Sequence, residues 1–143
     1  MKTITLLALI LCFFVACTAP ISKKVLREKP AYSVKFEVNK QYQRIFQSLL
    51  DQTRACYLHK PLKHQITVVG KRNNADKTAN IVVEHVYAMA NHDAYLMIDF
   101  KSLDEGRTEV EVYTSDSQAN KEVDGIKSWA TSSDTQCYAS WLS

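Results

Sequence analysis

The chain has 143 residues, of which 46% are hydrophobic and 23% are charged. Its 18 Lys and Arg residues against 15 Asp and Glu residues leave a formal net charge of +3, which is too balanced to predict nucleic-acid binding. A chain of this length is expected to form one domain with a modest core.

Residues 1–16 have the layout of an export signal. Lys2 supplies a positive charge, residues 4–15 form an apolar run, and the small residue Ala16 follows. The run is too short to span the hydrocarbon core of a bilayer, which takes about 20 residues. A positive start, a short apolar run and small residues are typical of a secretory signal peptide. We therefore predict that residues 1–16 are removed from the mature protein.

The end of this apolar run resembles the lipobox of bacterial lipoproteins. The residues that carry the resemblance are Phe14-Val15-Ala16-Cys17, in which Phe14 departs from the Leu, Val or Ile usual in the family. The resemblance implies cleavage before Cys17 and a covalent lipid on its thiol, with no other cofactor. Thr18 after the cysteine implies, in the same way, sorting to the outer membrane with the domain facing the periplasm.

A plain secreted protein is the alternative to a lipoprotein. Ordinary signal peptidase prefers small residues at the third and first positions before the cut. Cleavage after Ala16 would place Phe14 at the third position, and cleavage after Ala19 would place Pro20 just beyond the bond. Both are poor sites, so the lipoprotein interpretation is preferred.

Residues 17–31 are predicted to be a lipidated N-terminus and a tether to the folded domain. The segment contains two prolines, Pro20 and Pro30, and shows little periodicity. Its basic residues are Lys23, Lys24, Arg27 and Lys29. The alternative to a solvated linker is that these side chains lie against anionic head groups.

The first strand and helix of the domain are predicted from two different periods. Val34, Phe36 and Val38 alternate with charged residues, which predicts a strand with one buried face. Asn39 is a candidate N-cap for the helix that follows. Apolar or small side chains then recur at helical spacing, at Tyr42, Ile45, Phe46, Leu49, Leu50, Thr53 and Cys56.

After Pro61 apolar and polar residues again alternate with a period of two, which predicts four more strands. We expect them at residues 65–72, 78–89, 94–103 and 107–115, with turns at 73–77, 90–93 and 104–106. Because these connections have hairpin lengths, the strands should be antiparallel. A final helix is predicted to begin at Ser117 or Asn120, to break near residues 131–134, and to restart at a capping box formed by Ser133 and Gln136.

Residues 32–143 are therefore predicted to form a single α+β domain in the order β-α-β-β-β-β-α. A sheet with helices before and after a strand meander buries its apolar face most simply against both helices. The expected architecture has two layers, an antiparallel sheet with two helices packed on one face.

The cysteines predict a disulfide. Of the four, Cys12 lies in the signal and Cys17 is the predicted lipid-attachment residue, which leaves Cys56 and Cys137. Exported proteins meet an oxidising environment, so we expect these two cysteines to pair. Two buried free thiols are the alternative, and the spacing does not support a metal site.

Alternation along the strands also predicts a surface for a partner. The sheet face away from the helices is expected to carry Val69, Tyr95, Met97 and Tyr113. An uncovered sheet face this apolar indicates a contact with a partner or a ligand. Scattered surface apolar residues, which are common in monomers, are the alternative.

No motif in the sequence predicts catalysis. The chain has only three glycines and no phosphate-binding loop, and it lacks a nucleophile elbow. His59, His64, His85 and His92 have no spacing that indicates a metal site. We therefore expect a non-enzymatic protein.

The functional hypothesis is an outer-membrane lipoprotein that acts as a binding or assembly accessory for an envelope protein, with the membrane engaged through the lipid. At the level of the fold, residues 32–142 look like small α+β lipoproteins attached to envelope transport and assembly machines. Two alternatives remain, a periplasmic or secreted carrier of a small ligand such as a lipid, and an inhibitor or immunity-type protein.

Overall fold

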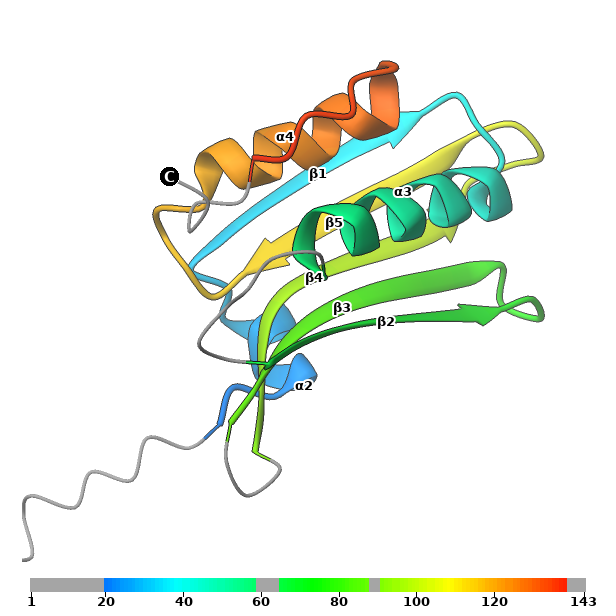
Figure 1. The fold of residues 1–143 in the computed structure, drawn as a ribbon. Helices are drawn as coiled ribbons and strands as arrows, with labels where there is room; N and C mark the ends of the chain where they lie inside the picture. Colours follow the sequence, from blue (N-terminus) through cyan, green and yellow to red (C-terminus); the bar gives the residue numbers. More distant parts are fainter. Residues whose placement is uncertain (1–19, 59–64, 88–90, 139–143) are drawn as a thin grey trace, which may run out of the picture.

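A five-stranded antiparallel sheet forms the centre of the computed structural model, which describes residues 20–58, 65–87 and 91–138 (Figure 1). The strands, in chain order, are β1 (Tyr32–Val38), β2 (Gln65–Asn73), β3 (Thr78–Val86), β4 (His92–Ser102) and β5 (Thr108–Thr114). The helices are α2 (Lys23–Glu28), α3 (Tyr42–Tyr57) and α4 (Asn120–Thr131).

The spatial order of the strands is β1-β5-β4-β3-β2. Strands β2 to β5 form a meander of neighbouring antiparallel pairs, as the short connections predict. β1 then pairs with β5, so the first strand of the chain lies beside the last. The predicted α+β fold and its antiparallel sheet are confirmed. The predicted turn at residues 90–93 is partly outside the described residues, and β4 already begins at His92.

The apolar stripe of α3 packs on the sheet, and the helix begins later than its candidate cap. Gln41, not Asn39, is the N-cap, and its carbonyl accepts the first helical hydrogen bond from Ile45 N at 3.1 Å. Gly70 in β2 allows the close approach of α3. A Cβ atom there would lie only 2.8 Å from a methyl carbon of Leu50.

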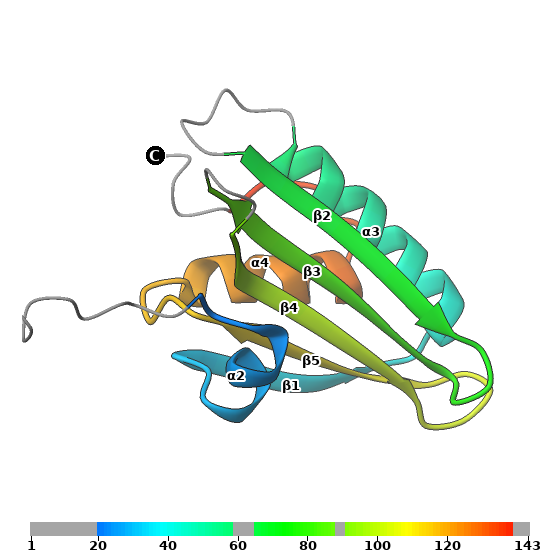
Figure 2. The ribbon, with the colours of Figure 1, turned by 90° about the horizontal axis from the view of Figure 1, so that it is seen from below.

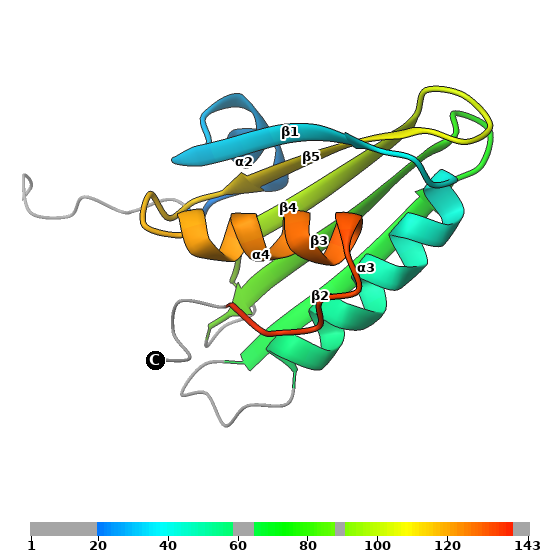
Figure 3. The same ribbon diagram turned by 90° about the horizontal axis from the view of Figure 1, so that it is seen from above.

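Helices α3 and α4 cover the same face of the sheet, with α3 over β2, β3 and β4 and α4 over β1 (Figure 3). The strand side chains beneath them that are fully buried are Ile81, Val83, Leu96, Ile98, Val110 and Val112. Two helices on one face are therefore confirmed.

The opposite face of the sheet carries helix α2, in the segment for which the sequence predicts a tether (Figure 2). Leu26 of α2 forms a second apolar cluster with Val82, Ala94 and Met97. The fold thus has a partial third layer in addition to the predicted two. This layer is formed by a segment that was expected to be a solvated tether.

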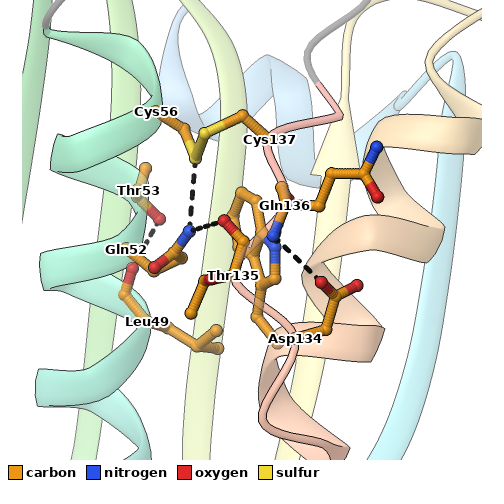
Figure 4. Close-up of a disulfide and its surroundings, with 9 residues drawn as sticks. Leu49, Gln52, Thr53, Cys56, Asp134, Thr135, Gln136 and Cys137 are labelled. Carbon is orange, nitrogen blue, oxygen red and sulfur yellow. Dashed lines mark hydrogen bonds between the residues drawn. A yellow bond between two sulfur atoms is a disulfide. The ribbon is translucent and has the colours of Figure 1, made fainter.

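The predicted disulfide between Cys56 and Cys137 is present (Figure 4). It joins the last turn of α3 to the segment that follows α4. Gln52 Nε2 supports this connection by donating to the carbonyl of Thr135 at 2.7 Å, and Trp129 Nε1 donates to the carbonyl of Gln136 at 2.7 Å. These bonds hold the chain after α4 against α3.

The predicted helix restart at Ser133 does not occur. Residues 134–138 have no regular secondary structure. The side chain of Asp134 accepts a hydrogen bond from Gln136 N at 2.9 Å, and Ser132 Oγ accepts one from Asp134 N at 3.1 Å. Because these side chains bind nearby backbone groups in a turn, they stabilise an irregular path in place of a new helix.

We predict that the double variant Cys56→Ser/Cys137→Ser unfolds more easily than the wild type. The bridge joins residues separated by 81 positions, so its loss lets the unfolded chain gain entropy. The expected loss is about 2–5 kcal/mol in the free energy of unfolding, measured by urea denaturation under oxidising conditions. Reducing agent should destabilise the wild type and leave the double variant unchanged. Equal stability of the two oxidised proteins would contradict a structural role.

Candidate functional site

The sheet face opposite α3 and α4 is organised in three rows that run across the strands. The row that we call the apolar row contains Ser33, Val69, Val82, Met97 and Tyr113. The two rows that we call the polar rows contain Lys35, Lys71, Asn80, Asp99 and Glu111, and Glu37, Asn73, Thr78, Lys101 and Glu109. The apolar row needs a cover, whereas the polar rows do not.

The cover is the segment 21–31, which we call the strap and which contains α2. Leu26 lies over the apolar row and is only 1% exposed. Ile21 and Tyr113 are partly buried and pack against the same cluster. Burying one Leu side chain contributes about 1.5–3 kcal/mol, so the strap is held firmly by this contact.

Hydrogen bonds made by its backbone groups hold the strap to the sheet at both of its ends. At the start, Ile21 N donates to Asp93 Oδ1 and Ala94 N donates to the Ile21 carbonyl, both at 2.9 Å. At the end, Ala31 N donates to the carbonyl of Thr114 at 2.9 Å. The segment predicted as a tether is therefore an integral part of the domain from Ile21 onwards.

The sequence contains a start signal and a stop signal for α2, but the helix between them is short. Ser22 is its N-cap and accepts a hydrogen bond from Val25 N at 3.2 Å, and Pro30 follows its end. A capping residue before the first turn and a proline one to three residues beyond the last are recognised helix signals. A helix of six residues shows too little periodicity to predict which face it buries, or against what.

Ion pairs connect the strap to the polar side chains of the sheet. Arg27 binds Asp99 through two hydrogen bonds, from Nε to Oδ2 at 2.7 Å and from Nη2 to Oδ1 at 2.9 Å. The hydrogen bond that Arg27 donates to Asp99 raises the pKa of Arg27 above its ordinary value. Lys23 Nζ lies 3.0 Å from Glu84 Oε1. Exposed pairs contribute only about 0–1 kcal/mol each, so they orient the strap and add little to its stability.

Three of the four predicted partner residues lie on this face. Met97 is fully buried, and Tyr113 is half-buried beside the strap. Burial, assisted by the carboxylate of Glu111, raises the pKa of Tyr113 and keeps its hydroxyl protonated. Val69 is half-buried in the edge strand β2, opposite Val82. The predicted apolar face exists, but the strap of the same chain occupies its centre.

Tyr95 lies on the other face of the sheet from the one that alternation predicts. A register shift in the β3–β4 pair places Leu96 opposite Val83 and Ala94 opposite Glu84, so Tyr95 is the extra residue of a bulge. Its side chain is 8% exposed and belongs to the core beneath the helices. The Tyr95 hydroxyl donates to Oε2 of the buried Glu122 at 2.6 Å. Strict alternation fails because the bulge adds one residue to β4.

The part of this face that another molecule can reach is charged. Lys35 Nζ lies 2.9 Å from Glu111 Oε2 and 3.4 Å from Glu109 Oε1. A depression of about 320 Å³ lies beside the strap, lined by Arg27, Thr78, Ala79, Asn80, Asp99, Phe100, Lys101, Glu109, Glu111 and Tyr113. Charges of both signs alternate here, so the surface fits a polar partner better than an apolar one.

A second polar depression, of about 480 Å³, lies at the hairpin end of the sheet. It is bordered by the β2–β3 turn, the β4–β5 turn and the start of α3, and its lining includes Gln41, Arg72, Lys77, Asp104 and Glu105. Tyr42 closes one side of it by donating from its hydroxyl to Asn74 Oδ1 at 3.0 Å. The polar lining again suits hydrogen bonds and ion pairs.

Several predicted features lie outside the described residues. Cys17 and the loop with His59 and His64 belong to these parts of the chain. In the part that is described, no three His, Cys, Asp or Glu side chains come together as a metal ion would require. Among the same residues, no helix combines the length and the apolar character needed to cross a bilayer.

We predict that Leu26→Ala lowers the free energy of unfolding by about 2 kcal/mol or more, because it removes the side chain that covers the apolar row. The matched control is Val25→Ala on the same helix, where the side chain is 44% exposed. This control should change stability by less than about 0.5 kcal/mol. Urea denaturation of both variants measures the difference. Equal midpoints would show that the strap does not stabilise the sheet.

No family model matches the chain, and no curated protein matches it significantly in sequence.

Proposed function

We propose that the protein is a non-enzymatic lipoprotein of the bacterial outer membrane, in which a small α+β domain faces the periplasm as a binding or assembly accessory. The observation that carries the proposal is the N-terminal sequence. A positive start, an apolar run and the segment Phe14-Val15-Ala16-Cys17 together match the layout of a lipoprotein signal. Three acyl chains on one cysteine would hold the protein stably, since one chain alone binds only marginally.

The disulfide between Cys56 and Cys137 supports export of the chain. Structural disulfides persist in oxidising compartments such as the periplasm and are rare in the cytosol. The pairing also leaves Cys17 as the cysteine available for a lipid, because Cys12 belongs to the predicted signal. The use of the cysteines is thus consistent with one exported, lipidated chain.

The proposed partner is an envelope protein that binds through polar contacts. Because the strap covers Val82, Met97 and Tyr113 at the centre of the apolar row, the accessible surfaces of the described residues include the polar rows and the polar depression at the hairpin end. Polar surfaces whose charges complement those of a partner favour specific and rapid association. This suits an accessory that joins and leaves a larger assembly.

The carrier alternative has less support. A ligand carrier needs apolar strand side chains that no helix side chain fills. Instead, the strand residues beneath α3 and α4 belong to one packed cluster with Ile45, Leu49, Val123 and Ile126 of the helices. No observation on the described residues favours an inhibitor over an assembly accessory.

The proposal predicts the mass and the location of the mature protein. Expressed in a bacterium with its own signal, the wild type should begin at Cys17 and carry three acyl chains, and it should remain with the membranes. Cys17→Ser should abolish this mass and release the protein in soluble or unprocessed form. Intact mass spectrometry and membrane fractionation measure both effects.

Cys12→Ser is the matched control, since Cys12 lies within the same predicted signal but outside the lipobox. This variant should be acylated and retained like the wild type. Unchanged membrane retention and mass of Cys17→Ser would contradict the proposal. An unlipidated wild type that starts at another residue would indicate a secreted protein.

A further inference from the structure

The strap begins very close in sequence to the proposed lipid-attachment residue. Only Thr18, Ala19 and Pro20 separate Cys17 from Ile21, where the strap starts. An extended chain spans at most about 3.6 Å per residue, so the Cα atoms of Cys17 and Ile21 lie within about 14 Å of each other. Ile21 itself is fixed to the sheet by its hydrogen bonds with Asp93 and Ala94.

We propose that the short segment 17–21, which the strap fixes to the sheet, acts as a leash that keeps one end of the sheet next to the bilayer and leaves the opposite end for the partner. This inference rests on the proposed lipidation of Cys17. The near end is defined by the start of β4 at His92 and the end of β5 at Thr114. The far end is defined by the β2–β3 and β4–β5 turns. Figure 2 shows α2 towards the near end and both hairpin turns at the far end.

The length of the sheet decides which orientations the leash allows. β4 runs from His92 to Ser102 between the two ends, and a strand rises about 3.4 Å per residue, so the ends lie about 34 Å apart. An inverted domain, with its hairpin turns on the lipid and its near end pointing away, would hold Ile21 at least about 27 Å above the surface, because Ile21 is bound to Ala94 and eight residues of β4 separate Ala94 from Ser102. The leash reaches only about half of that height, so it excludes the inverted orientation.

The charges beside the strap give the domain no reason to lie on its side. The polar rows carry both signs, and the carboxylates of Glu109 and Glu111 are paired with Lys35 and that of Glu37 with Arg107, so these rows offer no net positive charge to anionic head groups. Arg27 and Lys23 of the strap are bound to Asp99 and Glu84 of the sheet. An upright domain keeps these carboxylates in water and presents the depression at the hairpin end to the periplasm.

Two labelling sites test the proposal on the full-length, acylated protein. Gln118→Cys places an exposed thiol just beyond the end of β5, and Glu105→Cys places one in the β4–β5 turn. Each is labelled with a fluorophore and bound to vesicles of phosphatidylethanolamine and phosphatidylglycerol that contain a head-group spin label as quencher. The label at Gln118→Cys should be quenched several-fold more than the label at Glu105→Cys. Equal quenching, or stronger quenching at Glu105→Cys, would overturn the proposal.

Two further changes lengthen the leash and should remove this difference. A ten-residue Gly-Ser insertion between Ala19 and Pro20 leaves the strap in place but extends the reach to about 50 Å. Leu26→Asp should detach the strap, so that the leash runs from Cys17 to β1 and again reaches about 50 Å. Val25→Asp, at an exposed position of the same helix, is the control and should keep the difference. An unchanged difference with the insertion would overturn the leash mechanism.

Intact mass spectrometry distinguishes a failure of the proposed lipidation from a failure of the leash alone. Absence of acyl chains on Cys17 would overturn both the proposed function and the leash. Acylated protein whose two labels are quenched equally would overturn the leash alone and leave the lipoprotein assignment intact.

Discussion

The rest of the structure depends on the need to cover a sheet that carries apolar side chains on both faces. In its central strands, Ile81 and Ile98 point to one side, while Val82 and Met97 point to the other. Exposing these side chains to water on either face would lose the free energy that their burial contributes. The chain therefore supplies a cover for each face, α3 and α4 on one and the strap on the other. If either cover were lost, the exposed apolar face of the sheet would become a site of aggregation.

The two covers are held in different ways, and this difference has consequences for function. In the helical cover, α3 is held to the segment after α4 by the Cys56–Cys137 disulfide and by the hydrogen bond from Gln52 to the Thr135 carbonyl. Both helices also pack in one apolar core. The strap is held by one buried leucine, a few backbone hydrogen bonds and exposed ion pairs. Because the strap begins four residues after the proposed lipid anchor, its attachment to the sheet at Ile21 sets the distance between domain and bilayer.

The covering of both faces also determines what is left for recognition. With the apolar row beneath the strap, the accessible part of that face consists of paired charges, such as Lys35 with Glu111 and Arg27 with Asp99. A further polar depression at the hairpin end lies away from the strap. Recognition through such surfaces depends on complementary charge and is sensitive to salt. An assembly accessory of this design would bind its partner without exposing a hydrophobic patch in the free state.

Local sequence patterns determined the antiparallel meander, helix α3 and the pairing of Cys56 with Cys137, since period, turn length and the number of cysteines are all properties of the chain itself. Alternation also identified Val69, Met97 and Tyr113 as an apolar row, but it could not say which segment covers them. Only the tertiary structure assigned that cover to the strap, because a six-residue helix gains its stability from the sheet and not from its own sequence. The bulge that turns Tyr95 towards Glu122 could not be predicted from the sequence either. One extra residue in β4 moves a side chain to the other face of the sheet without changing the local pattern of residues.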